Sequence, residues 1–257
     1  MQQAYSKLDL TGRVIIVTGG GSGIGQETAK LLAARGAAVA VADVNDTGGE
    51  QTVAAISAAG GRAIYVRTDV SREAEVEALV AATVKRLGGL HGGFNNAGIF
   101  RKDGGLGRLS LDNWQSVIDI NLTGVFLCVK HQIAYMIANG GGSIVNTASG
   151  AGLVGTPGAG AYCASKHGVV GLTRAASAEY SARGVRVNAI APGMIETPMI
   201  DPSRLDAAAR EGLNRAHPIG RMGQAGEIAE AAAWLLSEAS SYVTGTVVPV
   251  DGGYTSI

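Results

Sequence analysis

Residues 13–25 read Arg-Val-Ile-Ile-Val-Thr-Gly-Gly-Gly-Ser-Gly-Ile-Gly. The β-branched apolar run at residues 13–18 is typical of a strand buried on both faces, as in parallel sheets. A glycine turn follows, and then a helical pattern that continues to Ala34 and ends at Gly36. A second apolar run, residues 38–42, ends at Asp43. This order of strand, glycine turn, helix, strand and acid predicts a dinucleotide-binding βαβ unit.

The alternation of strands and helices continues along the chain. Strands are expected at residues 13–18, 38–42, 63–67, 90–95, 143–147, 185–191 and 246–250. Further helices are expected at residues 45–59, 74–87, 110–138, 162–183, 204–216 and 225–236. The pattern predicts an α/β fold, a doubly wound (Rossmann-type) parallel sheet of about seven strands with helices on both faces. Since no linker or repeat interrupts it, we expect one domain over residues 1–257.

Composition excludes several classes of protein. Basic and acidic residues number 21 each, so no bulk charge attracts nucleic acid or an anionic membrane. Cys128 and Cys163 match no metal or redox spacing and are expected to be reduced core thiols. Residues 1–10 carry no apolar run of the signal-peptide type, and no stretch looks long and apolar enough to span a bilayer. We therefore expect a soluble, cytoplasmic protein without a metal.

The first glycine turn is a candidate cofactor site. Strict G-x-G-x-x-G does not fit, but glycines at 19, 23 and 25 would let the backbone approach a pyrophosphate at a helix N-terminus. Asp43, at the end of the second strand, could accept both ribose hydroxyls of the adenosine half and repel a 2′-phosphate. This favours NAD(H) over NADP(H). The alternative is that Asp43 caps the helix that starts near Asn45.

A second candidate site lies at residues 149–166. Tyr162 and Lys166 are four residues apart, so they share one face of a helix. A nearby ammonium favours the phenolate and brings the phenol closer to the pKa range useful for acid–base work. Ser149, at the end of a strand, could hydrogen-bond the same substrate oxygen. Alone, a Tyr-x-x-x-Lys pair is a weak motif, and Ser149 could simply be a turn serine.

In combination, these features resemble the short-chain dehydrogenase/reductase family over essentially the whole chain. The family fold has strand order 3-2-1-4-5-6-7. The motifs that carry the resemblance are Thr18-Gly19-x-x-x-Gly23-Ile24-Gly25, Asp69-Val70, Asn95-Asn96-Ala97-Gly98, Asn121, Ser149, Tyr162-x-x-x-Lys166 and Pro192-Gly193-x-x-x-Thr197.

The resemblance implies a catalytic tetrad. Tyr162 would be the general acid/base, and Lys166 would lower its pKa and bind the nicotinamide ribose. Ser149 would orient the substrate oxygen, and Asn121 would hold a water in a proton relay through Lys166. The implied cofactor-binding residues are Gly19, Ser22, Gly23, Ile24, Gly25, Asp43, Asp69, Val70, Asn96, Ala97, Gly98, Tyr162, Lys166, Pro192, Gly193, Ile195 and Thr197. Family members are commonly homotetramers, which here would pair the helices that start near Ser110 and Ala161.

The expected function is NAD(H)-dependent interconversion of a secondary alcohol and a ketone. Substrate choice should lie in residues 100–109, in 150–160, and in a substrate-binding lid at about 193–217. The expected substrate contacts are Ser149, Gly150, Leu153, Tyr162, Met194 and Met199. Because this lining is largely apolar, we expect a neutral, hydrophobic or cyclic substrate. An anionic substrate tail could instead be met by cationic side chains of the same segments, namely Arg101, Lys102, Arg204 and Arg215.

Two other functions stay open at this point. One is a β-ketoacyl (acyl-carrier-protein or CoA) reductase that uses NADPH, against which Asp43 counts. The other is a non-catalytic dinucleotide-binding regulatory protein, against which the intact tetrad counts.

Overall fold

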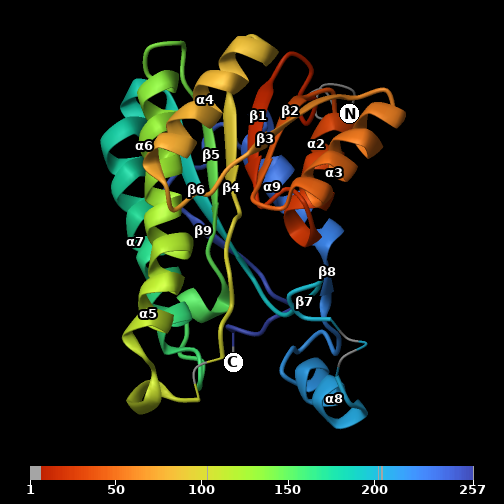
Figure 1. The fold of residues 1–257 in the computed structure, drawn as a ribbon, viewed down its shortest axis with the longest axis vertical. Coiled ribbons are helices and arrows are strands. Elements are labelled where there is room, and N and C mark those ends of the chain that lie inside the picture. The colour runs from red at the N-terminus through yellow and green to blue at the C-terminus, as the bar shows by residue number, and fades with distance from the viewer. Residues whose placement is uncertain (1–6, 103, 202, 204, 257) are drawn as a thin grey trace.

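The centre of the molecule is a parallel sheet (Figure 1). The computed structural model describes residues 7–256 except 103, 202 and 204, and within that part of the chain this sheet has seven strands in the order β3-β2-β1-β4-β5-β6-β9. The strands are β1 (Val14–Thr18), β2 (Ala38–Asp43), β3 (Arg62–Arg67), β4 (Gly92–Asn95), β5 (Gly142–Thr147), β6 (Val185–Pro192) and β9 (Val247–Val250). Numbered within the sheet alone, this is 3-2-1-4-5-6-7, so the predicted topology is confirmed.

Helices cover both faces of the sheet (Figure 1). One face carries α2 (Gly23–Ala34), α3 (Asp46–Ala58) and α9 (Ala225–Leu236). The other carries α4 (Glu73–Leu87), α6 (Gly124–Met136) and α7 (Gly160–Tyr180). Strands covered on both sides need apolar residues at every position, which is why β1 reads as a continuous apolar run.

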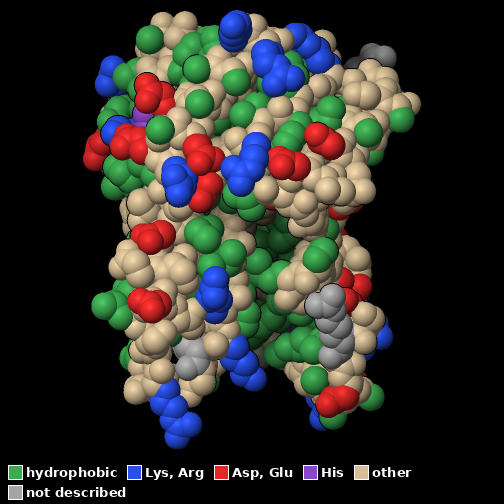
Figure 2. Space-filling view, in the orientation of Figure 1, with side chains coloured by type: hydrophobic (Ala, Val, Ile, Leu, Met, Phe, Trp, Pro, Cys, Tyr) green, Lys and Arg blue, Asp and Glu red, His purple; other side chains and the backbone are tan. Residues whose placement is uncertain are grey.

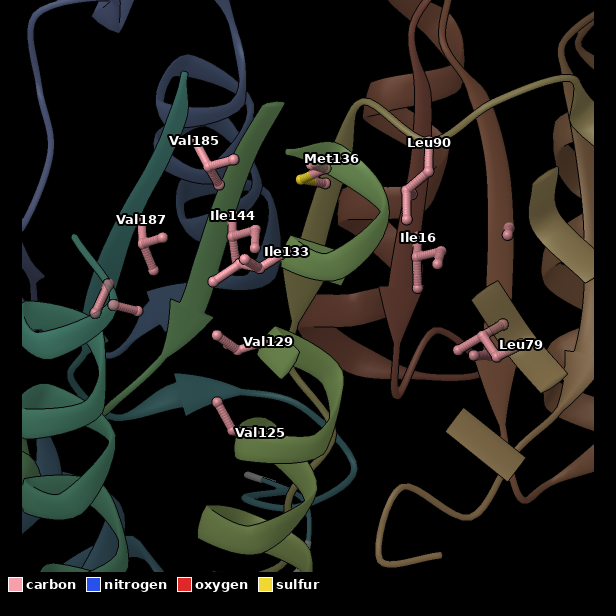
Figure 3. Close-up of a cluster of buried hydrophobic side chains, with 14 of the residues drawn as sticks. Ile16, Leu79, Leu90, Val125, Val129, Ile133, Met136, Ile144, Val185 and Val187 are labelled. Atoms are coloured by element: carbon pink, nitrogen blue, oxygen red, sulfur yellow. The ribbon is translucent and has the colours of Figure 1, made fainter. Parts of the chain in front are cut away.

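Each face has its own hydrophobic cluster. In β1, Ile16 joins one cluster, while Ile15 and Val17 join the other, as strand alternation requires. Figure 3 shows the cluster on the α4, α6 and α7 side. Its labelled members are Ile16, Leu79, Leu90, Val125, Val129, Ile133, Met136, Ile144, Val185 and Val187. These clusters fix the sheet on which the site is built.

A buried polar network crosses the same core. The Asn95 amide on β4 donates to Gln132 Oε1 at 3.1 Å and to Asn146 Oδ1 at 3.0 Å, and Gln132 Nε2 donates back to Asn95 Oδ1 at 2.8 Å. Asn146 Nδ2 in turn donates to Thr173 Oγ1 at 3.0 Å. All four side chains are buried, so each amide depends on the others for its hydrogen bonds. The network ties β4 and β5, the strands that lead into the site, to α6 and α7.

The helix predicted at residues 110–138 is not regular. It consists of α5 (Leu111–Ile118), a π-turn at Asp119–Thr123, and α6. Short π-turns inside α-helices occur frequently at functional sites. By length and composition the continuous stretch Leu111–Met136 could cross a membrane, contrary to the expectation from the sequence. Half of it is buried inside the fold, however, and core helices pass the same test.

The segment after β6 includes residues 193–217, which the sequence predicts as a lid. It contains a two-stranded sheet of β7 (Ile195–Glu196) and β8 (Gly223–Gln224), which the sequence did not predict, and α8 (Ala207–Arg215). Asp206 caps α8 by accepting from Ala209 N at 2.7 Å, and no residue of α8 is buried. That residues 1–257 form one domain with a lid at about 193–217 stays a prediction.

The buried imidazole of His217 ties both ends of this lid together. Nε2 accepts from Met194 N at 3.1 Å, so the proton is on Nδ1, which donates to Leu213 O at 2.8 Å.

Candidate active site

The glycine turn between β1 and α2 forms an open cradle at a helix N-terminus. Gly19 and Gly23 have φ of 64° and 52°, a backbone region that favours glycine. A Cβ at Gly25 would lie 2.1 Å from the carbonyl oxygen of Gly19, so no side chain fits there. Ser22, the N-cap of α2, makes no side-chain capping bond. The turn therefore leaves N–H groups and a hydroxyl free for an anion, which fits the pyrophosphate of a dinucleotide.

Thr18 connects this turn to the next strand of the site. Its Oγ1 accepts from Asn96 N at 3.0 Å and from Ala97 N at 3.1 Å, and Asn96 Nδ2 donates to Thr18 O at 3.1 Å. Thr18 is buried. The sequence marked Thr18 only as part of a motif, because a hydroxyl at a strand end does not reveal which backbone groups it will meet. In the structure it sets the ends of β1 and β4 relative to each other.

Asp43 lies at the edge of the same cleft. One carboxylate oxygen accepts from Gly21 N and the other from Asn45 N, each at 2.9 Å. The N-cap of α3 is Asn45, which accepts from Gly48 N at 3.2 Å, so Asp43 is not the capping residue. Each carboxylate oxygen has a second lone pair, so both hydrogen bonds leave capacity for ribose hydroxyls.

The predicted cofactor residues gather in two clefts that share Ile24, Asn96, Gly98, Thr197 and Met199 and so form one continuous groove. Figure 2 shows the molecule hollowed in this region, with hydrophobic side chains along the hollow. The first cleft contains the predicted Gly19, Ser22, Gly23, Ile24, Asp43, Asp69, Val70, Asn96, Ala97, Gly98 and Thr197. The second adds Tyr162, Lys166, Pro192, Gly193 and Ile195. Of the predicted cofactor residues, Gly25 alone lines neither cleft.

Ser149, Tyr162 and Lys166 all line the second cleft. Ser149 caps a 3-10 turn, Gly150–Gly152, at the end of β5, where its Oγ accepts from Ala151 N at 3.2 Å. Tyr162 and Lys166 project from the first turns of α7, with Lys166 Nζ 5.6 Å from the centre of the Tyr162 ring. The ammonium is buried and donates to the carbonyl oxygen of Thr147 at 2.7 Å. The hydroxyl, phenol and ammonium thus line one cleft, and Tyr162 and Lys166 share a face of α7 as their spacing predicted.

Burial governs the acid–base properties of this trio. It raises the pKa of the Tyr162 phenol above its ordinary value, and a hydrogen bond with Ser149 opposes that rise. Burial also lowers the pKa of Lys166 to about 8. The sequence assigned the lowering of the phenol pKa to Lys166, whereas here the main opposing interaction comes from Ser149.

Asn121, within the π-turn, holds the backbone of a neighbouring loop. Its Oδ1 accepts from Ile99 N at 2.8 Å, and its Nδ2 donates to Ile99 O at 2.9 Å and to Ser165 Oγ at 3.3 Å. The side chain is fully buried. Both ends of the amide are therefore engaged by protein groups. The predicted role in a proton relay through Lys166 stays a prediction.

The predicted substrate contacts are placed at different depths. Met199 is half-exposed and lines both parts of the groove. Met194 lines a neighbouring cavity beside His217, and Leu153 packs against the core. Gly150 is buried, and a Cβ there would lie 2.9 Å from the ring of Tyr254. Ile200, from the lid, lines the second cleft as well.

Two side chains near the trio were not singled out from the sequence, although Phe100 begins the segment 100–109 that is expected to govern substrate choice. The Phe100 ring meets the Tyr162 ring edge to face, with centroids 5.3 Å apart and planes at 82°. Thr147 lines the second cleft, and its buried hydroxyl has no hydrogen-bond partner. An aromatic residue after a glycine-containing loop and a threonine at a strand end have many possible environments, so sequence alone could not assign either one.

The cationic side chains of the substrate segments lie at the surface. Arg101 and Lys102 are exposed, and Arg215 pairs with Glu211 at 3.0 Å. Asp103, Pro202 and Arg204 lie outside the described residues. Among the described residues that line the second cleft, Lys166 is the only charged one.

The two thiols sit in different surroundings. Cys128 is buried, and burial raises the pKa of its thiol to about 12. Cys163 is half-buried next to Tyr162. Within the part of the chain that the structure describes, no three His, Cys, Asp or Glu side chains are grouped to hold a metal ion.

Known proteins resemble this chain over almost its whole length. Residues 19–255 match the family model described as enoyl-(acyl carrier protein) reductase. The chain is 53% identical to 2,5-dichloro-2,5-cyclohexadiene-1,4-diol dehydrogenase of Sphingobium indicum over 97% of its own length and 99% of the relative. It is 43% identical to cyclohexanol dehydrogenase of Acinetobacter sp. (strain SE19), with 95% of each chain covered.

A solved structure shows the same likeness in three dimensions. The crystal structure of levodione reductase superposes with a TM-score of 0.93 at 44% identity, and the match covers 96% of this chain and 99% of that one.

Proposed function

The chain belongs to the short-chain dehydrogenase/reductase family, and from this premise we propose that it is an NAD(H)-dependent dehydrogenase of alicyclic secondary alcohols. It is an oxidoreductase that interconverts a secondary alcohol and a ketone with a nicotinamide dinucleotide. We infer that it prefers NAD(H) and acts on a ring-shaped alcohol. The observation that carries the reaction is the convergence of Ser149, Tyr162 and Lys166 in the groove that the glycine turn opens.

The protein groups have separate tasks in this reaction. In alcohol oxidation Tyr162, as phenolate, takes the hydroxyl proton, and Ser149 donates a hydrogen bond to the substrate oxygen. The buried Lys166 ammonium places a positive charge beside the phenolate. When bound, the nicotinamide accepts or supplies the hydride, and the chain positions the reacting atoms.

Asp43 supports the preference for NAD(H). Its carboxylate is fixed by the two backbone N–H groups of Gly21 and Asn45, so it cannot turn away without breaking both hydrogen bonds. A 2′-phosphate beside it would place like charges together, while a 2′-hydroxyl would donate to it.

Two observations support a ring-shaped alcohol. The second cleft is lined mainly by glycine and apolar residues, with Asn96, Thr147 and Thr197 as polar residues besides the catalytic groups. Lys166, its one charged side chain among the described residues, donates to the carbonyl oxygen of Thr147. The relatives from Sphingobium and Acinetobacter are named for a cyclohexadiene diol and for cyclohexanol. A neutral six-membered ring fits such a wall.

The test is a steady-state screen with cyclohexanol, cyclohexanone and open-chain secondary alcohols, each with NAD(H) and NADP(H), read by nicotinamide absorbance. We expect turnover of the cyclic pair and a higher kcat/KM with NAD(H). Substituting Asp43→Asn should reduce the ratio of kcat/KM with NAD(H) to kcat/KM with NADP(H). A strong NADPH preference in the native chain would refute the Asp43 argument and favour a β-ketoacyl reductase.

We also propose a cytoplasmic homotetramer. The exposed apolar side chains Leu111 and Phe126, on α5 and α6, support an assembly that covers this helix. Light scattering that gives a monomer would reject it.

A further inference from the structure

The Phe100 side chain packs against that of Tyr162, the acid–base residue. Its ring stands edge to face with that of Tyr162, at a centroid distance of 5.3 Å. This is the arrangement that aromatic quadrupoles favour. Tyr162 lines the groove, and so does Ile99, the residue before Phe100. The Phe100 ring therefore packs against a residue that lines the groove, and the residue before it lines the groove as well.

Asn121 holds the backbone of the residue that precedes Phe100. Asn121 holds both backbone groups of Ile99, accepting from its N–H at 2.8 Å and donating to its carbonyl at 2.9 Å. Asn121 is fully buried in the π-turn and also donates to Ser165 Oγ on α7 at 3.3 Å, so it links the Ile99 backbone to that helix. The residue that follows Ile99 presents its ring at a set distance from Tyr162.

The Phe100 ring is only partly buried. Phe100 is 44% exposed, although a phenyl ring stabilises the fold most when buried. Met199, 52% exposed, provides a second open apolar side chain on the groove. An exposed aromatic surface next to the reacting phenol offers contact to the part of a substrate that extends beyond its carbinol carbon.

We propose that Phe100 is a specificity-determining residue that contacts the carbon ring of an alicyclic alcohol while Tyr162 acts on its hydroxyl; this assignment rests on the proposed function. A six-membered ring reaches past the carbinol carbon to an apolar wall. A molecule such as 2-propanol, with one methyl group on either side, has no atoms to place there. Phe100 thus raises the specificity for ring substrates over short open-chain ones.

The experiment compares cyclohexanol with 2-propanol as substrates of Phe100→Ala. We expect kcat/KM for cyclohexanol to fall roughly tenfold, mostly through KM, because uniform binding is lost. For 2-propanol, kcat/KM should change less than about twofold. Phe100→Tyr, which keeps the ring, should retain the native ratio, and Phe100→Leu should fall between. NADH binding, followed by fluorescence, should stay unchanged in all three variants.

Tyr242→Ala is the matched control, since that aromatic side chain is fully exposed and makes no ring contact among the described residues. It should leave both substrates unaffected. If Phe100→Ala leaves the ratio of kcat/KM for cyclohexanol to kcat/KM for 2-propanol unchanged, whether or not both values fall, the assignment is overturned. If Phe100→Ala does not fold, Phe100→Leu and Phe100→Tyr decide by the same ratio. A native chain inactive on every alcohol would instead refute the proposed function.

Discussion

Replacing Thr18 with valine tests how the cofactor cleft is held together. Valine has nearly the same shape as threonine, so the substitution leaves no cavity. It removes the one oxygen that accepts from Asn96 N and Ala97 N at 3.0 and 3.1 Å. Thr18 is 1% exposed, so water cannot easily replace that acceptor.

The magnitude follows from the two N–H groups left without a partner. Each buried unsatisfied donor costs about 1–3 kcal/mol, and some relaxation is expected, so the free energy of unfolding should fall by about 2–4 kcal/mol. For a chain of this size that lowers Tm by roughly 4–16 °C. Asn96 and Ala97 also line the cofactor cleft, so NADH affinity should weaken by about tenfold.

The assays are equilibrium urea unfolding and titration of NADH by fluorescence. Thr83→Val is the matched control: Thr83 is equally buried, but its hydroxyl only donates to the helical carbonyl of Leu79, at 2.7 Å. Its loss should cost about 1 kcal/mol or less. If Thr18→Val and Thr83→Val unfold within about 1 kcal/mol of each other, the accounting of unsatisfied donors is wrong.

Three further predictions concern acid–base behaviour and the glycine turn. Because a hydrogen bond from Ser149 lowers the pKa of Tyr162, Ser149→Ala should raise that pKa and move the rise of kcat/KM for alcohol oxidation to higher pH; an unmoved profile would contradict this. Burial lowers the pKa of His91, whose Nδ1 accepts from Val14 N at 3.0 Å, so the unfolded chain takes up the proton first. Its stabilisation should be complete above about pH 6.5 and decline below it; Tm measured from pH 7.5 to 5.5 should fall less in His91→Asn than in the native chain. Gly25→Ala should give little folded protein on circular dichroism, because its Cβ would lie 2.1 Å from a carbonyl oxygen, and native-like yield with normal NADH binding would count against that geometry.

Much of the fold was predictable because it depends on repeated patterns. Apolar runs that alternate with helical periodicity fixed the number of strands in the main sheet, and the resemblance supplied their order. The convergence of Ser149, Tyr162 and Lys166 followed from spacing on one helix and one strand end. These features involve local geometry, which short stretches of sequence encode.

Other features depend on contacts between distant segments and left no local signal. The π-turn contains no glycine or proline to mark it, and Asn121 meets Ile99 only after α5 and β4 have packed. In the same way, His217 links two parts of the segment after β6 by accepting a hydrogen bond from Met194 N, 23 residues earlier. The contact between Phe100 and Tyr162 likewise joins a loop to α7, and no sequence pattern pairs the two.

The open position of α8 bears on how such an enzyme could diverge. No residue of this helix is buried, and the imidazole of His217 holds the segment at its base. Core positions tolerate few changes, because each must preserve packing density. Mutations in α8 escape that constraint and cost folding little. The sequence of this helix is therefore free to diverge while the sheet and the proton-transfer residues stay the same.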